Sequence, residues 1–135
     1  MLMLSKEKMD FLKEARVGRI ATIGYKNLHL VPICYAYDER NFYIATDKES
    51  VKAKNLRKNP EAVLLIDEYF EDWSKLKGIM IKGKVEIIEK GEEFKYGKDL
   101  LYKKYPQYEK EVPIKEGESV ILKLEPKKII SWGWK

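Results

Sequence analysis

Only three residues separate two β-rich runs near the start of the chain, and this short connection limits the fold more than any other feature of the sequence. The runs are VGRIATIG, residues 17 to 24, and LHLVPICYAY, residues 28 to 37, joined through Tyr25, Lys26 and Asn27. So short a connection permits an antiparallel hairpin, whereas a parallel crossover needs about a dozen residues or more. The sequence therefore predicts an antiparallel sheet.

The rest of the chain continues this pattern of short strands with helices inserted between them. Further strands are predicted at residues 42 to 46, 61 to 69, 78 to 88 and 119 to 134, the last as one or two strands. Helices are predicted at residues 5 to 16, with Ser5 as N-cap, at 46 to 59, with Thr46 as N-cap, and at 92 to 104. Six or seven strands in hairpin order do not make βαβ units. We therefore predict a mainly β protein, a small antiparallel barrel with short flanking helices.

The length and composition exclude several classes of protein. A chain of 135 residues, 44% hydrophobic and 36% charged, suits a single soluble domain over residues 1 to 135. No apolar run reaches the roughly 18 residues of a membrane span, and charges interrupt the first 11 residues, so a cytoplasmic location is expected. With one cysteine and one histidine, no internal disulfide and no metal site are expected. The net charge of +5 argues only weakly for nucleic acid.

The most basic segment of the chain is TDKESVKAKNLRKNP, residues 46 to 60. Residues three or four apart share a helix face, so Lys48 and Lys52 are expected near the first turn. Free backbone N–H groups there, a hydroxyl from Thr46 or Ser50 and a lysine would together make a phosphate cradle. The alternative is a solvated basic face, which surface helices often have. The local pattern leaves both interpretations open.

Four other residues each have a functional and a structural interpretation. Pro32 lies inside a predicted strand and cannot donate to the ladder, so it marks an edge, a bulge or a place where a ligand approaches the backbone. Trp73, in a predicted loop, is either a stacking surface for a planar ring or a packing anchor. His29 is either a ligand contact or a residue at the barrel mouth. Cys34 is predicted to be a buried apolar filler.

The order of these segments closely resembles the pyridoxamine 5'-phosphate oxidase-like family of flavin-binding split barrels. The resemblance extends from about Phe11 to Trp134 and rests on ARVGRIATIG, HLVPICYAYD, FYIATDKESVKAKNLRKNPEAVLLID, DWSKL and GKVEII. Its most specific part is the segment ending in NLRKNP. Within the family, the chain is most similar to a small branch proposed to use the deazaflavin F420.

The resemblance implies a six-stranded antiparallel split β-barrel of the FMN-binding type. It also implies a homodimer with FMN or F420 in a groove at the subunit interface, and it places Thr46, Ser50 and Lys52 at the cofactor's phosphate. The other predicted cofactor-binding residues are Arg19, Ile20, Ala21, Thr22, Val31 and Pro32. Trp73 is added to them as a residue that could stack on the ring.

Three features depart from the oxidases themselves. Val51 stands where they have an arginine beside the phosphate lysine, and Gly78 where they have a glutamine that contacts the flavin. The C-terminal IISWGWK lacks their arginine and histidine pair for the vitamin's phosphate. We therefore do not expect vitamin B6 oxidation.

Three hypotheses about function remain. The first is a cytoplasmic, dimeric oxidoreductase in which FMN or F420 transfers hydride to or from an unknown small molecule, with the catalytic side chains unassigned. The second is a flavin-binding carrier without enzymatic activity, because the chemistry requires no protein side chain as acid or base. The third is a basic barrel that binds single-stranded nucleic acid through lysine and aromatic side chains.

Overall fold

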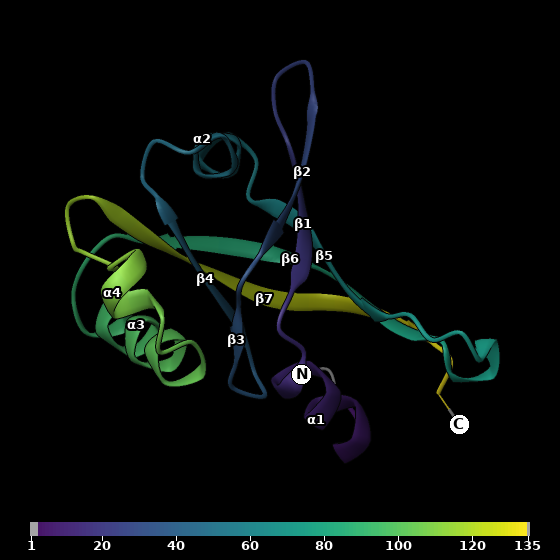
Figure 1. Ribbon diagram of the computed structural model, residues 1–135. Coiled ribbons are helices and arrows are strands. Elements are labelled where there is room, and N and C mark those ends of the chain that lie inside the picture. The colour runs from purple at the N-terminus through teal and green to yellow at the C-terminus, as the bar shows by residue number, and fades with distance from the viewer. Residues whose placement is uncertain (1–2, 135) are drawn as a thin grey trace.

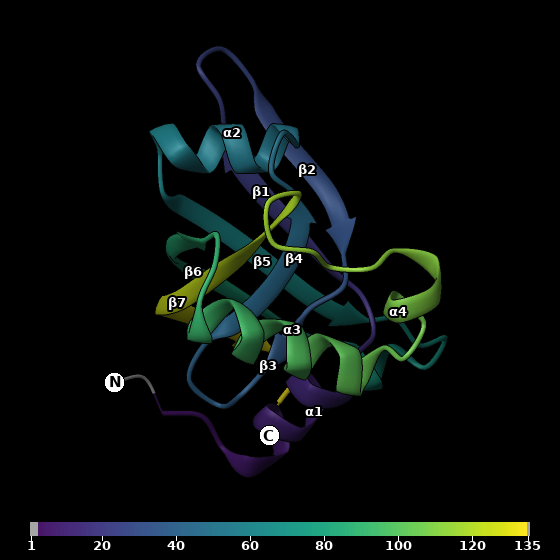
Figure 2. The same cartoon turned by 90° about the vertical axis from the view of Figure 1, so that its left-hand side faces the viewer.

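The computed structural model describes residues 3–134 and contains one antiparallel sheet that curls into a half-barrel (Figures 1 and 2). The order of its strands is β2-β1-β5-β6-β7-β4-β3, and hydrogen bonds join each strand to the next. The strands are β1 (Gly18–Ile23), β2 (Leu28–Ile33), β3 (Ala36–Tyr37), β4 (Phe42–Asp47), β5 (Glu61–Glu68), β6 (Lys77–Ile88) and β7 (Ser119–Trp132). The predicted mainly β split-barrel fold is confirmed.

The sheet has seven strands where the family resemblance implied six. The extra strand arises because the predicted run of residues 28 to 37 is interrupted at Cys34 and Tyr35. The backbone N–H of Tyr35 donates to the hydroxyl of Tyr105, 3.3 Å away, and does not join the ladder. β2 and β3 therefore become separate strands at opposite ends of the sheet order.

The helices lie around the sheet, and their starts test the predicted caps. They are α1 (Lys6–Glu14), α2 (Val51–Lys58), the 3-10 helix η1 (Trp73–Lys75), α3 (Glu92–Lys104) and α4 (Tyr108–Glu111). Ser5 caps α1 as predicted, and α3 has the predicted bounds. The predicted cap at Thr46 is wrong: Thr46 pairs with Val120 in the sheet, so α2 begins only after Ser50. The short helix α4 was not predicted.

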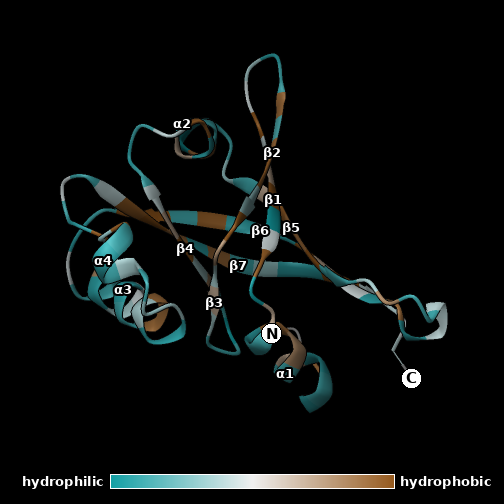
Figure 3. Ribbon diagram, viewed as in Figure 1, coloured by the Kyte–Doolittle hydropathy of each residue, from teal (hydrophilic) through white to brown (hydrophobic). Residues whose placement is uncertain are grey.

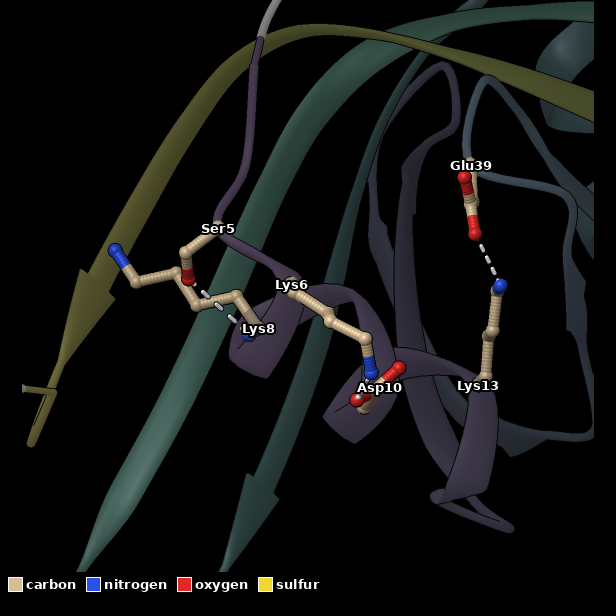
Figure 4. A network of polar contacts seen from close by, with 6 residues as sticks. All are labelled: Ser5, Lys6, Lys8, Asp10, Lys13 and Glu39. Carbon is tan, nitrogen blue, oxygen red and sulfur yellow. Dashed lines mark hydrogen bonds and ion pairs between the residues drawn. The ribbon is translucent and has the colours of Figure 1, made fainter.

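Polar contacts lie at both ends of helix α1, and Figure 4 shows the Ser5 cap and the Lys13–Glu39 pair. The Ser5 hydroxyl accepts the backbone N–H of Lys8 at 3.3 Å, and the Lys8 ammonium donates to Ser131 on β7 at 2.8 Å. Near the last turn, Lys13 pairs with Glu39 of the β3–β4 turn. Helix α1 thus covers one end of the curled sheet, where its Leu12 is fully buried.

Two apolar clusters hold the fold together. The first fills the concave side of the sheet, with α1 and α2 covering it: Leu12, Ile20, Tyr35, Phe42, Ile44, Leu56, Leu64, Ile66, Ile79, Ile81, Leu122 and Leu124 are among its members. The second lies between α3 and the β4–β7 region, with Tyr43, Phe94, Leu101, Tyr105, Ile114 and Ile121. Residues 3–134 contain no helix with the length and apolar character needed to cross a bilayer.

Lys104, at the end of α3, has an unusual environment for an ammonium group. Its Nζ is buried and, among the described residues, has no hydrogen-bond partner. It lies 4.0 Å from the centre of the Tyr35 ring and 5.3 Å from that of Tyr105. Burial, with the charge of nearby Arg16, lowers the pKa of Lys104 to about 8. The two aromatic faces offset part of the cost of burying the charge.

We expect the Lys104→Met variant to be more stable than the wild type below pH 8, by roughly 1–2 kcal/mol after allowance for solvent screening. The folded pKa is depressed, so between about 8 and the ordinary 10.5 the unfolded chain binds the extra proton. Wild-type stability therefore rises across this window, and the variant's advantage disappears. Urea unfolding at pH 7, 9 and 10.5 measures the difference. Lys103→Met, at an exposed neighbour, is the control, and an advantage that does not change with pH would contradict the assignment.

Candidate functional site

The first turn of α2 presents several unused hydrogen-bond donors. Asp47 accepts the N–H groups of Glu49, through its side chain at 2.8 Å, and of Ser50, through its carbonyl at 3.0 Å. The Ser50 hydroxyl accepts the Ala53 N–H at 3.2 Å, which leaves its own proton free to be donated. In the described part of the chain, the N–H groups of Val51 and Lys52 have no partner. These donors and the helix dipole together favour an anion at this position.

Lys52 is the cation best placed to serve that turn. It is half-buried, and burial lowers its pKa. Within residues 3–134, no ion pair includes Lys52, whereas Lys54 lies 3.9 Å from Glu49 and is exposed. A partly desolvated ammonium without a counterion is costly unless an anionic ligand neutralises it. The structure thus distinguishes Lys52 from the other cations of the segment.

A buried hydrogen bond ties α2 to the sheet beside this turn. The Asn55 side-chain amide donates to the Thr22 hydroxyl at 3.1 Å, and both side chains are at least nine-tenths buried. Thr22 lies on β1, directly opposite His29 on β2. This buried bond holds the middle of α2 against β1, and Figure 2 shows α2 lying across β1.

The predicted residues on β1 and β2 divide between the two faces of the sheet. Ile20 is fully buried, so only its backbone is available to a ligand, and Val31 packs half-buried against the concave core. Arg19 and Pro32, which pair across the strands, are exposed on the convex face. Arg19 lies 3.2 Å from Asp67 in an exposed ion pair. Pro32 lies on the edge strand β2, which is one of the three positions predicted for it.

The convex side of strands β2, β1, β5, β6 and β7 carries an outer apolar face. Register places Pro32, Arg19, Leu65, Met80 and Ile130 in one row across the five strands. Leu28 is 80% exposed and Leu30 is 66% exposed. Figure 3 shows hydrophobic colour along β2 and β5.

We define this face by residues Ile23, Leu28, Leu30, Pro32, Leu65, Met80, Ile130 and Trp132. Ala21 lines a groove of about 580 Å³ in it, together with Val63 and Lys82.

Trp73 lies far from α2 within one chain. It begins η1, at the tip of the β5–β6 hairpin, is 72% exposed, and donates its indole N–H to the Tyr69 hydroxyl at 3.2 Å. Figure 1 shows this tip at the right-hand end of the molecule, away from α2 and from the tip of the β1–β2 hairpin. A single chain therefore does not bring Trp73 together with Thr46, Ser50 and Lys52.

Trp132 is a residue that the sequence interpretation did not place in the site. It pairs with Gly78, and a Cβ on Gly78 would come within 2.2 Å of the Trp132 ring. The indole therefore lies on the space that a side chain at position 78 would take, and it remains 45% exposed on the outer apolar face. Position 78 is therefore a glycine, where the oxidases have a glutamine, because the Trp132 indole occupies the space of a side chain there.

His29 and Cys34 have different surroundings. His29 is half-buried on the edge strand β2. Cys34 is only partly buried, so the prediction of a buried filler is wrong, and it packs against the cluster between α3 and the sheet. Among residues 3–134, no three histidine, cysteine, aspartate or glutamate side chains gather as a metal site would require.

A cavity of about 430 Å³ adjoins the start of α2. Its walls are the β4–α2 turn, including Thr46, and the connection from α4 to β7. The Lys48 N–H donates to the Glu118 carbonyl at 3.0 Å, which continues the β4–β7 ladder into the loops and joins the two walls. The cavity and the first turn of α2 are therefore supported by the same pair of strands, β4 and β7.

Comparison with known proteins identifies a matching family model and solved structures with the same fold. A family model described as pyridoxamine 5'-phosphate oxidase matches residues 4–133. A search of curated proteins found no match.

Solved structures share the fold over nearly the whole chain. A conserved hypothetical protein from Mycobacterium tuberculosis is 25% identical, with a TM-score of 0.81 over 97% of this chain and 86% of its own. A FAD-binding protein from Mesorhizobium loti is 20% identical, with a TM-score of 0.78 over 96% and 92%. The heme storage protein HutZ from Vibrio cholerae is 12% identical, with a TM-score of 0.79 over 96% and 94%. The last two are similar in fold alone.

Proposed function

Since the chain belongs to the pyridoxamine 5'-phosphate oxidase family, we propose that it is an oxidoreductase that binds FMN or coenzyme F420 as a homodimer. The observation that carries the proposal is Lys52, a half-buried ammonium without an ion pair among the described residues, beside the free N–H groups at the start of α2. This donor set suits a phosphate monoester or diester, which both cofactors contain.

The protein's part in the reaction is binding, orientation and exclusion of water. Lys52, the Ser50 hydroxyl and the first-turn amides would hold the phosphate, while Thr46 would extend the same support along β4. The backbone of residues 19 to 22 would contact the flavin, and because Ile20 is fully buried, it would do so through its main chain alone. When bound, the cofactor supplies hydride transfer to or from a small molecule.

The outer apolar face supports the homodimer. A contiguous exposed apolar patch of this kind marks an interaction surface in a soluble protein. A two-fold axis would place the same face of each subunit against the other, because most homodimers have isologous interfaces. Arg19, Pro32 and Trp132, which lie on this face, would then lie within the subunit interface.

A titration followed by visible absorption tests the proposal. We expect purified protein to bind FMN or F420 with a shift of the cofactor's visible band, at one cofactor per subunit. The fluorescence of the bound flavin then reports its affinity. Riboflavin, which has no phosphate, is the matched ligand and should bind more weakly.

Two outcomes would contradict flavin binding, and a third would contradict the enzymatic activity. The first is no spectral shift with either cofactor but salt-sensitive binding of single-stranded DNA, which would favour the basic-barrel hypothesis. The second is a Soret band after addition of hemin, lost in His29→Ala, because His29 is the chain's only histidine and the fold is shared with a heme storage protein. Cofactor binding without turnover of any electron acceptor would favour a carrier.

A further inference from the structure

Apart from tyrosines, the buried polar side chains among residues 3–134 are Thr22 on β1 and Asn55 in α2, and they bond to each other. We propose that this pair is a positioning device. It sets the distance and the angle between the first turn of α2 and the backbone of β1, so that one ligand can be held at both places at once. The inference rests on the proposed function, which puts the cofactor's phosphate at that turn and its ring beside β1.

The Asn55 amide meets the β1 segment at two points. Its nitrogen donates to the Thr22 hydroxyl at 3.1 Å. A Cβ on Gly24, which directly follows β1, would come within 2.8 Å of its oxygen, so the amide lies close to the bare backbone there. Ala53 and Leu56 also hold α2 on the sheet, but apolar contacts have no preferred direction. The amide therefore fixes the position of the helix along β1.

This anchor lies one turn beyond the proposed phosphate clamp. Residues three apart share a helix face, so Asn55 lies on the face of Lys52, about 4.5 Å further along the axis. Ser50 caps the same eight-residue helix, which ends at Lys58. Because so short a helix moves as a unit, a shift at Asn55 also displaces Lys52, the Ser50 hydroxyl and the free first-turn amides.

The other end of the bond lies on a strand that is itself fixed. Thr22 pairs with His29 of β2 on one side and with Ala62 of β5 on the other. Its side chain is 1% exposed, so the hydroxyl acts on a ligand through α2 and not by touching it. A ligand that spans β1 and α2 gains affinity from binding at two linked sites, and this gain depends on their spacing.

Fragments of the cofactor separate positioning from binding. FMN carries the ring and the phosphate, riboflavin the ring alone, and inorganic phosphate the anion alone. In Thr22→Val, which replaces the hydroxyl by a methyl group, we expect the FMN affinity to fall about tenfold and the affinities for riboflavin and phosphate to change by less than about twofold. Flavin fluorescence measures the first two, and NMR shifts of the Lys52 amide the third. If the wild type prefers F420, F420 and its phosphate-free deazaflavin replace FMN and riboflavin.

Two further variants test the bond itself. Thr22→Ser keeps the hydroxyl and should bind FMN within about twofold of the wild type, since the hydrogen bond can still form. Gly24→Ala leaves the Thr22 hydroxyl in place, but its Cβ would press on the Asn55 oxygen. It should show the same pattern as Thr22→Val, with a loss for FMN and almost none for the two fragments.

Hydrogen exchange without any ligand tests the inference apart from the cofactor. Thr22→Val should speed exchange of the α2 amides more than that of the β6 and β7 amides. Ile79→Val, which removes one buried methyl group from the centre of the sheet, is the control and should speed exchange in β6 but leave α2 and the FMN affinity unchanged.

Three outcomes would overturn the inference alone: an unchanged FMN affinity in Thr22→Val, fragment affinities that fall as far as that of FMN, or α2 exchange that rises no more than that of β6 and β7. A wild type that binds neither FMN nor F420 would overturn the proposed function as well.

Discussion

Replacing Lys52 by alanine is expected to lower the affinity for FMN or F420 by about 10- to 150-fold, which corresponds to the roughly 1.5–3 kcal/mol of a hydrogen bond to a charged group. Lys52 is half-buried, and its ammonium is already partly desolvated, as its lowered pKa indicates. It can therefore bind a phosphate with little further loss of hydration. Fluorescence titration at fixed ionic strength measures the change.

Two controls separate a phosphate clamp from general electrostatics. Lys58→Ala removes the same charge from the exposed last turn of the same helix, and we expect less than a twofold effect, because a distant exposed charge is screened by salt. Riboflavin, which has no phosphate, should bind wild type and Lys52→Ala almost equally. If Lys52→Ala binds FMN and F420 as tightly as the wild type, Lys52 does not bind the phosphate. If Lys52→Ala and Lys58→Ala lose the same affinity, the effect is one of general charge and not of a phosphate clamp.

The second large effect is expected for Leu65→Glu, which should convert the dimer to a monomer. Leu65 lies in the middle of the outer apolar face, paired with Arg19 on one side and Met80 on the other. A two-fold interface would bury one new carboxylate from each subunit, and the neighbouring Arg19 is already paired with Asp67, so we expect a cost of about 3–5 kcal/mol, or more than 100-fold in the dimer dissociation constant. Sedimentation velocity over a range of concentrations measures the change.

The variant should remain folded, because the side chain points to the convex face and not into the core. Circular dichroism at constant concentration checks this. Val112→Glu introduces the same charge at an exposed apolar residue away from the outer apolar face and should leave the association unchanged. A wild-type protein that is monomeric at all concentrations, or a Leu65→Glu dimer as stable as the wild type, would contradict the proposed interface.

Features that depend on neighbouring residues in the chain could be predicted from the sequence. The Tyr25 to Asn27 connection gave the antiparallel hairpin, and the alternation in β6 gave a strand with one packed face. Ser5 and the bounds of α3 followed from capping and helical periodicity. In each case the residues that decide the structure lie within one turn or one strand of each other.

Features that depend on distant partners could not be predicted in this way. Thr46 has the local pattern of an N-cap, but a ladder with Val120, more than 70 residues away, holds it in a strand. Tyr105 interrupts the β2–β3 run by bonding to Tyr35. The contact between Trp132 and Gly78 is equally long-range, although both residues were visible in the sequence, one near the start of β6 and the other at the end of β7.

The assignment of Lys52 shows how the two kinds of evidence combine. Local spacing placed Lys48 and Lys52 near the first turn but left both a phosphate cradle and a solvated basic face open, and family resemblance selected Lys52. The structure adds that Lys54 has an acidic neighbour and that the Arg57 guanidinium donates to the Lys48 carbonyl at 2.7 Å. Burial and the lack of an ion pair in the described residues then distinguish Lys52 on physical grounds.

The arrangement of the sheet has a consequence for how a ligand enters. β6 and β7 pair with each other over most of their length, and each also pairs with a second strand, whereas β2 has β1 as its one neighbour in the sheet order. Amide protons of β6 and β7 should therefore exchange with solvent only when the whole domain unfolds, and those of β2 by local opening. A ligand can then enter by local opening of the β2 edge while the Asn55–Thr22 bond holds α2 on β1 and the centre of the sheet stays closed.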